Sequence, residues 1–121
     1  MPRSVVNVIA WLLQIGLAAV FLMAGGSKLA GQKMMVDMYD LIGYGQWFRY
    51  VTGIIEVTSA VLLLMPSTAF YAGVLIVCTM IGATIAHFTV LHQPPNAPVT
   101  LGCLALVMMF LRRPGFLMRR A

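Results

Sequence analysis

Long apolar stretches dominate the chain, and short polar breaks divide them into four blocks. The blocks cover residues 5–27, 48–65, 69–91 and 97–111. A membrane-crossing helix needs about 20 predominantly apolar residues, so blocks of this length and composition favour transmembrane helices. Pro66 follows the second block, and the segment HQPPNAP at 92–98 interrupts any helix between the third and the fourth. The pattern predicts an all-α integral membrane four-helix bundle that forms a single domain over residues 1–121.

The segment between the first two blocks, residues 28–49, mixes apolar and charged side chains. Its apolar positions are Met34, Met35, Met38, Tyr39, Leu41 and Ile42, and Lys33, Asp37 and Asp40 lie among them. This pattern predicts a short, amphipathic interfacial helix that lies at the outer face of the membrane. Tyr44, Trp47 and Tyr50 are expected to form an aromatic belt where the second long helix enters the bilayer.

Composition and charge support a membrane location. Apolar residues make up 61% of the chain and charged residues 9%, against about 25% charged in typical soluble domains. The net charge is +5, but four of the eight cations lie in the tail RRPGFLMRR, beside an apolar block. Such cations set topology and meet lipid headgroups, so we expect no nucleic-acid partner. With four spans, the positive-inside rule predicts both termini in the cytoplasm of a cell (inner or plasma) membrane protein.

Metal and redox motifs are missing from the sequence. Cys78 and Cys103 fall in separate blocks and form no CxxC pair, so we expect small buried side chains rather than a redox dithiol or a zinc site. The sequence has neither a glycine-rich phosphate loop nor an HExxH motif. We therefore expect no metal and no intrinsic cofactor.

Four ionisable residues are predicted to lie in the same half of the membrane. Glu56 lies seven residues beyond Arg49, which is about 10 Å into the bilayer at 1.5 Å per residue. His87 precedes Pro94 by the same number of residues on the returning helix, and Lys28 closes the outer end of the first block. The topology thus predicts a polar cluster in the outer half of one small bundle.

Helical spacing gathers the polar residues on single stripes. One stripe of the second block holds Arg49, Gly53, Glu56, Ala60 and Leu63, and one of the first holds Asn7, Gln14, Phe21 and Lys28. Both stripes should face the bundle interior, because a charge facing lipid costs about 2.5–3.5 kcal/mol on insertion scales. Gly25 and Gly53 are candidates for close helix packing. Glu56 then has two interpretations: an ion pair with Arg49 or Lys28 that holds helices in register, or a ligand or proton site.

Three passages resemble a known family. They are AVFLMAGGSKLAG at 19–31, LIGYGQWFRYVTGIIEVTSAVLLLMP at 41–66 and AGVLIVCTMIGATIAHF at 72–88. Together they make the chain similar to the DoxX-like family of small four-helix membrane proteins; Gln46 departs from the proline expected in its loop. The resemblance implies a left-handed four-helix bundle with a polar pocket near one membrane face, and pocket or packing roles for Lys28, Gly53, Glu56 and His87.

The resemblance implies no single activity, because relatives are linked to quinone-coupled thiosulfate oxidation, to oxidative-stress complexes and to assembly of other membrane proteins. The first hypothesis is a lipophile- or quinone-binding accessory subunit of a membrane redox or stress-response complex, rather than a stand-alone enzyme. Its pocket would be formed by Lys28, Arg49, Glu56, His87 and Gln14, with catalytic residues unassigned. The alternatives are a structural or chaperone-like subunit and a proton-coupled small-molecule exporter. Expected partners are membrane lipid and either another membrane protein or a second copy of the chain.

Overall fold

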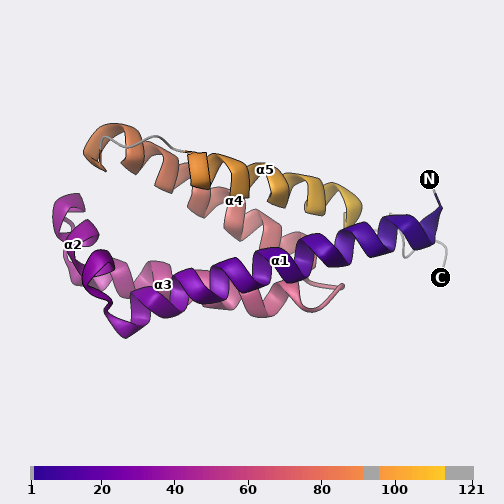
Figure 1. Ribbon diagram of the computed structural model, residues 1–121, viewed down its shortest axis with the longest axis horizontal. Helices are drawn as coiled ribbons and strands as arrows, with labels where there is room; N and C mark the ends of the chain where they lie inside the picture. The colour runs from indigo at the N-terminus through magenta and orange to yellow at the C-terminus, as the bar shows by residue number, and fades with distance from the viewer. Residues whose placement is uncertain (1, 92–95, 114–121) are drawn as a thin grey trace.

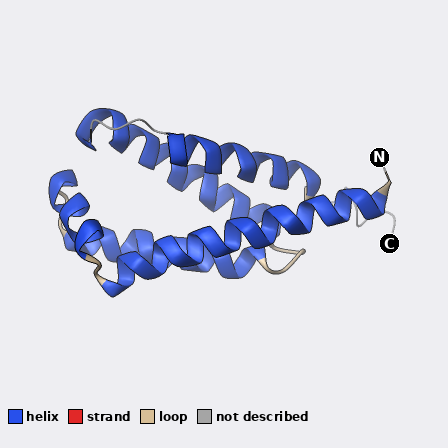
Figure 2. Ribbon diagram, in the orientation of Figure 1, coloured by secondary structure: helices blue, strands red, loops and turns tan. Residues whose placement is uncertain are grey.

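The computed structural model describes residues 2–91 and 96–113, and all regular structure in these two stretches is helical (Figure 2). The helices are α1 (Arg3–Ala30), α2 (Lys33–Ile42), α3 (Gln46–Leu63), α4 (Ala69–Ala86), the π-helix η1 (His87–Leu91) and α5 (Asn96–Leu111). The all-α prediction is confirmed. Pro94, Pro95, Arg119 and Arg120, on which parts of the topology prediction depend, lie outside the described residues.

Each predicted apolar block forms a helix, but the third differs from the expectation of one α-helix over 69–91. Here α4 ends at Ala86 and the chain continues as the π-helix η1. The side chains of Thr84, His87 and Thr89 each contact the carbonyl oxygen four residues earlier at 2.8 Å. Such side-chain bonds compete with the backbone ladder and bend helices, which explains the widened turn.

Two helical stretches in the described part of the chain are long and apolar enough to cross a membrane. They are Arg3–Ala30 and Ala69–Thr89, whereas Asn96–Leu111 is apolar but shorter. The α3 helix is 18 residues long and carries Arg49 and Glu56, which lower its mean hydropathy. Membrane crossing by α3 and α5 therefore stays a prediction.

Each of the four long helices packs against two of the others. The α1 helix packs on α3 and α5, and α4 packs on α3 and α5. Figure 1 shows the start of α1 and the end of α5 at one end of the molecule, with α2 and η1 at the other. The α2 helix contacts α3 and η1 there.

The core between these helices is narrow. Its fully buried large side chains include Phe21, Leu63, Ile76 and Met108. Many large apolar side chains point outward instead, among them Leu12 (67% exposed), Met23 (73%), Ile54 (56%) and Phe110 (60%). An apolar surface this extensive suits lipid better than water.

The α1 and α3 helices approach most closely at two glycines. A Cβ atom on Gly25 would lie 2.8 Å from the carbonyl oxygen of Gly53 and 2.8 Å from Cγ2 of Val57. A Cβ on Gly53 would lie 3.0 Å from Cγ of Leu29. Because neither glycine has a side chain, the two backbones can touch here, as in small-residue packing between membrane helices.

The segment predicted as an amphipathic helix is helical over the bounds of α2. Gly31 and Gly43, with φ values of 74° and 87°, end α1 and α2 in the left-handed conformation that favours glycine. Tyr39 is buried on the inner face of α2, and Met34 and Leu41 are exposed. The sharp turns fold α2 back over the N-terminal end of α3. The position of α2 at a membrane interface stays a prediction.

Candidate functional site

A buried ion pair joins α1 to α3. The Nζ atom of Lys28, in the last turn of α1, lies 2.7 Å from Oε1 of Glu56 in the middle of α3. The two side chains are 11% and 5% exposed. The pair lies one turn from the Gly25–Gly53 contact, because Lys28 follows Gly25 by three residues and Glu56 follows Gly53 by three. The glycines therefore bring the two charges within reach.

The ion pair leaves hydrogen-bonding capacity unused. The Lys28 Nζ atom lies 2.7 Å from Oε1 of Glu56, and no other described residue donates a hydrogen bond to that oxygen. A buried carboxylate oxygen in this state can accept a bond from a ligand hydroxyl.

Arg49 belongs to the same cluster but has another partner. Its side chain is buried, and Nη1 donates to the carbonyl oxygen of Lys28. Its Nε donates to Oε1 of Gln46 at 2.7 Å, and its guanidinium carbon lies 4.3 Å from the ring centre of Tyr50. In the described structure, the ion pair of Glu56 is with Lys28 and not with Arg49. Arg49 instead satisfies a carbonyl at the end of α1, where cations are favourable.

Gln46 connects this cluster to α2. Its Nε2 atom donates to Oδ1 of Asp40 at 2.7 Å and to the carbonyl oxygen of Val36 at 3.1 Å, while Oε1 accepts from Arg49. A proline in place of Gln46 could make none of these side-chain bonds. The departure from the expected family sequence thus has a structural role in this chain.

Tyr39 is a member of the cluster that sequence reasoning did not assign to the site. Its side chain is 5% exposed and its ring packs 5.8 Å from Phe48. Burial raises the pKa of the Tyr39 phenol; the Thr52 side chain lowers it, the charge of Glu56 raises it and that of Arg49 lowers it. The signal was its place in the apolar pattern of α2, which marks a buried face but not what that face covers.

His87 was expected to join the cluster, and its observed contact is within its own helix. Its Nδ1 atom lies 2.8 Å from the carbonyl oxygen of Ala83, and the side chain is half-buried. Because a carbonyl only accepts, Nδ1 carries the proton in this contact. No hydrogen bond or ion pair joins His87 to Glu56 in the part of the chain that the structure describes. The η1 helix does contact α2, at the end of the molecule where the cluster lies.

Gln14 was also expected in this pocket, but it belongs to a different polar site. It precedes Lys28 by 14 residues, or about 21 Å along the helix axis. Gln14 is fully buried, its Nε2 donates to the carbonyl oxygen of Leu63 at 2.7 Å, and its Oε1 accepts from Nε of Arg112 at 2.6 Å. The Gln14 amide therefore ties α1 to the ends of α3 and α5.

The comparison with family models identifies the chain. The model of the DoxX-like family matches residues 12–110, which include the ion pair, Arg49, Gln14 and His87. The chain belongs to the DoxX-like family. The searches of curated proteins and of solved structures gave no match. Family membership and the apolar helices together support a membrane protein.

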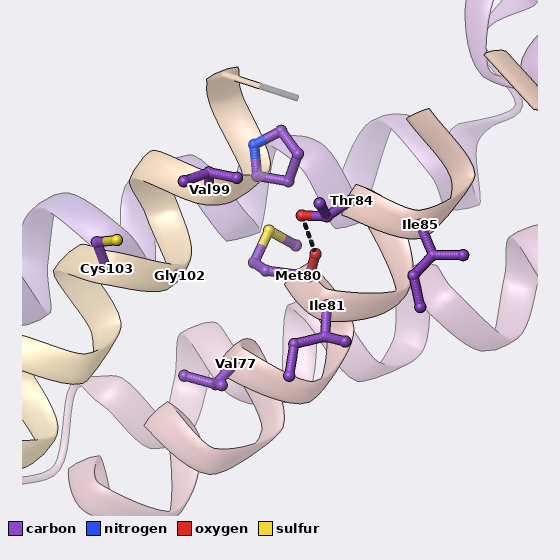
Figure 3. A pocket seen from close by; sticks show the side chains of 9 residues that line it. Val77, Met80, Ile81, Thr84, Ile85, Val99, Gly102 and Cys103 are labelled. Atoms are coloured by element: carbon purple, nitrogen blue, oxygen red, sulfur yellow. Dashed lines mark hydrogen bonds between the residues drawn. The ribbon is translucent and has the colours of Figure 1, made fainter. Parts of the chain in front are cut away.

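A groove lies between α4 and α5 of this DoxX-like protein (Figure 3). Its volume is about 260 Å³, and its lining residues are Val77, Met80, Ile81, Thr84, Ile85, Pro98, Val99, Gly102 and Cys103. The Thr84 hydroxyl donates to the carbonyl oxygen of Met80 at 2.8 Å, so the walls present almost only carbon and sulfur (Figure 3). Cys103 and Cys78 are free thiols on the exposed surface, which corrects the expectation that both are buried.

Proposed function

We propose that this DoxX-like protein is a multi-pass membrane subunit that binds a lipophilic ligand, such as a quinone, at the Lys28–Glu56 pair. The observation that carries this proposal is a buried carboxylate oxygen whose only partner among the described residues is a buried ammonium group 2.7 Å away. Ionisable groups inside a membrane are costly, and they commonly mark functional sites.

The chemistry of the pair suits a ligand head that both accepts and donates. The Lys28 ammonium has three donor hydrogens, and Oε1 of Glu56 can accept a second hydrogen bond beside its contact with Lys28. A quinone carbonyl would accept from Lys28, and a quinol hydroxyl would donate to Glu56. Arg49 would limit water at the head, since its side chain is buried and binds the carbonyl oxygen of Lys28.

The proposal includes a membrane arrangement. The α1, α3, α4 and α5 helices would cross the bilayer as a left-handed bundle, with α2 at the outer interface. The start of α1 and the end of α5 would lie in the cytoplasm, where Arg112 and Arg113 follow the positive-inside rule. In this arrangement the chain is an accessory subunit of a redox or stress-response complex, and a partner protein supplies the electrons.

A second candidate function is a structural or chaperone-like subunit, and one observation favours it. The ion pair, the Arg49 bond to the Lys28 carbonyl and the Gly25–Gly53 contact all join α1 to α3. Holding two helices in register would be a sufficient role for a cluster built this way. Its outward apolar side chains would then pack against another membrane protein.

Native mass spectrometry of protein extracted gently from its own membrane tests the two functions. We expect a stoichiometric small lipophile on the wild type and on the exposed-acid control Asp37→Asn, and none on Glu56→Gln. A wild type that carries no ligand, or carries only another polypeptide, would favour the structural function.

A charge swap, Lys28→Glu with Glu56→Lys, separates ligand binding from folding. The swapped pair keeps the attraction between α1 and α3, so the thermal stability lost in each single variant should return. The ligand should stay absent, because donor and acceptor have changed places. If the swap restores both stability and the bound lipophile, the pair does not recognise the ligand head.

A further inference from the structure

The two ends of the molecule differ in charge. All three acidic residues, Asp37, Asp40 and Glu56, lie in α2 and α3. The end formed by the start of α1 and the end of α5 (Figure 1) holds the cations Arg3, Arg112 and Arg113. Because the sequence between 57 and 121 has no acid, no carboxylate side chain of the α4–α5 hairpin can pair with Arg112.

Arg112 is held in a defined orientation at this end. Its Nε atom donates to Oε1 of Gln14 at 2.6 Å, and its guanidinium carbon lies 5.7 Å from the ring centre of Trp11. Gln14 is itself fixed, because it is fully buried and donates to the carbonyl oxygen of Leu63. One edge of the guanidinium is therefore occupied and the plane is set by its neighbours.

One nitrogen of the Arg112 guanidinium lacks an acceptor. Its Nη2 atom is buried and has no hydrogen-bond partner among the described residues. Burial lowers the pKa of this guanidinium, although arginine stays charged at neutral pH. The Arg112 side chain is half-buried, and its Nη2 donor has no compensating acceptor, so the hydrogen bonding of the site is incomplete as the chain alone forms it.

We propose that the Nη2 edge of Arg112 binds a phosphate group, supplied at the membrane surface by an anionic phospholipid. The planar guanidinium matches the spacing of two phosphate oxygens, and arginine is favoured wherever phosphate is recognised in this way. Trp11, one face of which the guanidinium covers, is the type of side chain enriched at the headgroup level. This inference rests on the proposed membrane orientation, which places this end of the bundle at the cytoplasmic surface.

Tryptophan fluorescence provides the test. The chain has two tryptophans, so Trp47→Phe leaves Trp11 as the only reporter, beside Arg112. In detergent micelles this variant is titrated with dihexanoyl phosphatidylglycerol, with inorganic phosphate, and with dihexanoylglycerol, which has the chains but no phosphate. We expect a saturable change with phosphatidylglycerol and none with dihexanoylglycerol. An equal response to inorganic phosphate would assign the free anion as the source of the group.

Two variants of neighbouring arginines make the test specific. Arg112→Gln should weaken binding by about 10- to 100-fold, the loss expected for a charge-assisted hydrogen bond, whereas Arg113→Gln should change it little. Arg112→Lys keeps the charge, and it replaces Arg112→Gln in the titration if the glutamine variant does not fold. Equal weakening by the Arg112 and Arg113 variants, or no response to either phosphate compound, would overturn the site. The charge swap Lys28→Glu with Glu56→Lys, which is expected to fold and to lose the lipophile, should leave the Trp11 response intact, so failure of the lipophile site and failure of this one are distinguishable.

Discussion

Removing one charge of the Lys28–Glu56 pair is expected to destabilise the protein far more than removing both. Glu56→Gln leaves the Lys28 ammonium buried without a counter-charge, and Lys28→Met leaves the Glu56 carboxylate in the same state. Breaking a buried pair from one side costs about 3–5 kcal/mol, because the remaining charge loses its compensation. Replacing both members with neutral groups of similar volume is often close to neutral, since the desolvation cost of both charges disappears.

The assay is a double-mutant cycle. Unfolding of the two single variants, the double variant and the wild type is followed in mixed micelles by helical circular dichroism as denaturing detergent is added. If each single variant loses about 3–5 kcal/mol and the double variant about 0–2 kcal/mol, the coupling energy is several kcal/mol.

The chain supplies a matched control pair. Lys33 and Asp37 lie 3.5 Å apart, four residues apart on α2, but their side chains are 92% and 59% exposed. Water screens such a pair, so the same cycle should yield about 0.5 kcal/mol or less. Additive losses at Lys28 and Glu56, with a coupling no larger than that of the control, would refute the inference that the two buried charges stabilise each other.

Three further predictions follow from the packing. Gly25→Ala should lower the free energy of unfolding by about 1–3 kcal/mol, because its Cβ would lie 2.8 Å from the Gly53 carbonyl oxygen. Gly26→Ala, with no atom within 4 Å of the new Cβ, should be neutral or slightly stabilising. Unfolding in denaturing detergent compares the two variants. Gln46→Pro should keep α3 helical, since proline is tolerated at the first helical position. The variant should speed amide hydrogen exchange in α2, because the bonds from Gln46 to Asp40 and Val36 are broken. Unchanged exchange would contradict the role of Gln46 in holding α2. Because the pKa of Tyr39 is raised in the folded protein, the phenol of the unfolded chain ionises first as pH rises. The contribution of Tyr39 to stability is therefore complete below the ordinary pKa of 10.0 and is lost as pH rises above that value. The Tyr39→Phe variant should therefore show a flatter alkaline stability profile than the wild type, and parallel profiles would argue against the buried phenol.

Helical periodicity predicted which faces of the long helices are buried. All five residues of the α3 stripe, Arg49, Gly53, Glu56, Ala60 and Leu63, are buried in the structure. On α1, Gln14, Phe21 and Lys28 are buried and Asn7 is exposed. The prediction succeeds because side chains three, four and seven residues apart share a face, and a polar face in an apolar helix must turn inward. Asn7 differs because it lies near the end of α1, where a polar side chain reaches water without crossing apolar surroundings.

The sequence left open which polar groups would meet. Both Arg49 and Lys28 were candidate partners for Glu56, and only the crossing of α1 over α3 at Gly25 and Gly53 selects Lys28. Gln14 was assigned to the same pocket because it shares a stripe with Lys28, but its partners, Leu63 and Arg112, lie at the far end of the molecule. A shared stripe specifies direction around a helix axis and says nothing about position along it.

The sequence by itself thus determined an apolar helical chain, its buried faces and the identity of its few polar side chains. Tertiary structure alone decided the ion pair, the bond from Arg49 to the Lys28 carbonyl and the contact between Arg112 and Gln14. These contacts join residues up to 98 positions apart, and each depends on how two helices cross and on where along each axis they touch. Local spacing does not encode that crossing, because it is set by the packing of several helices at once.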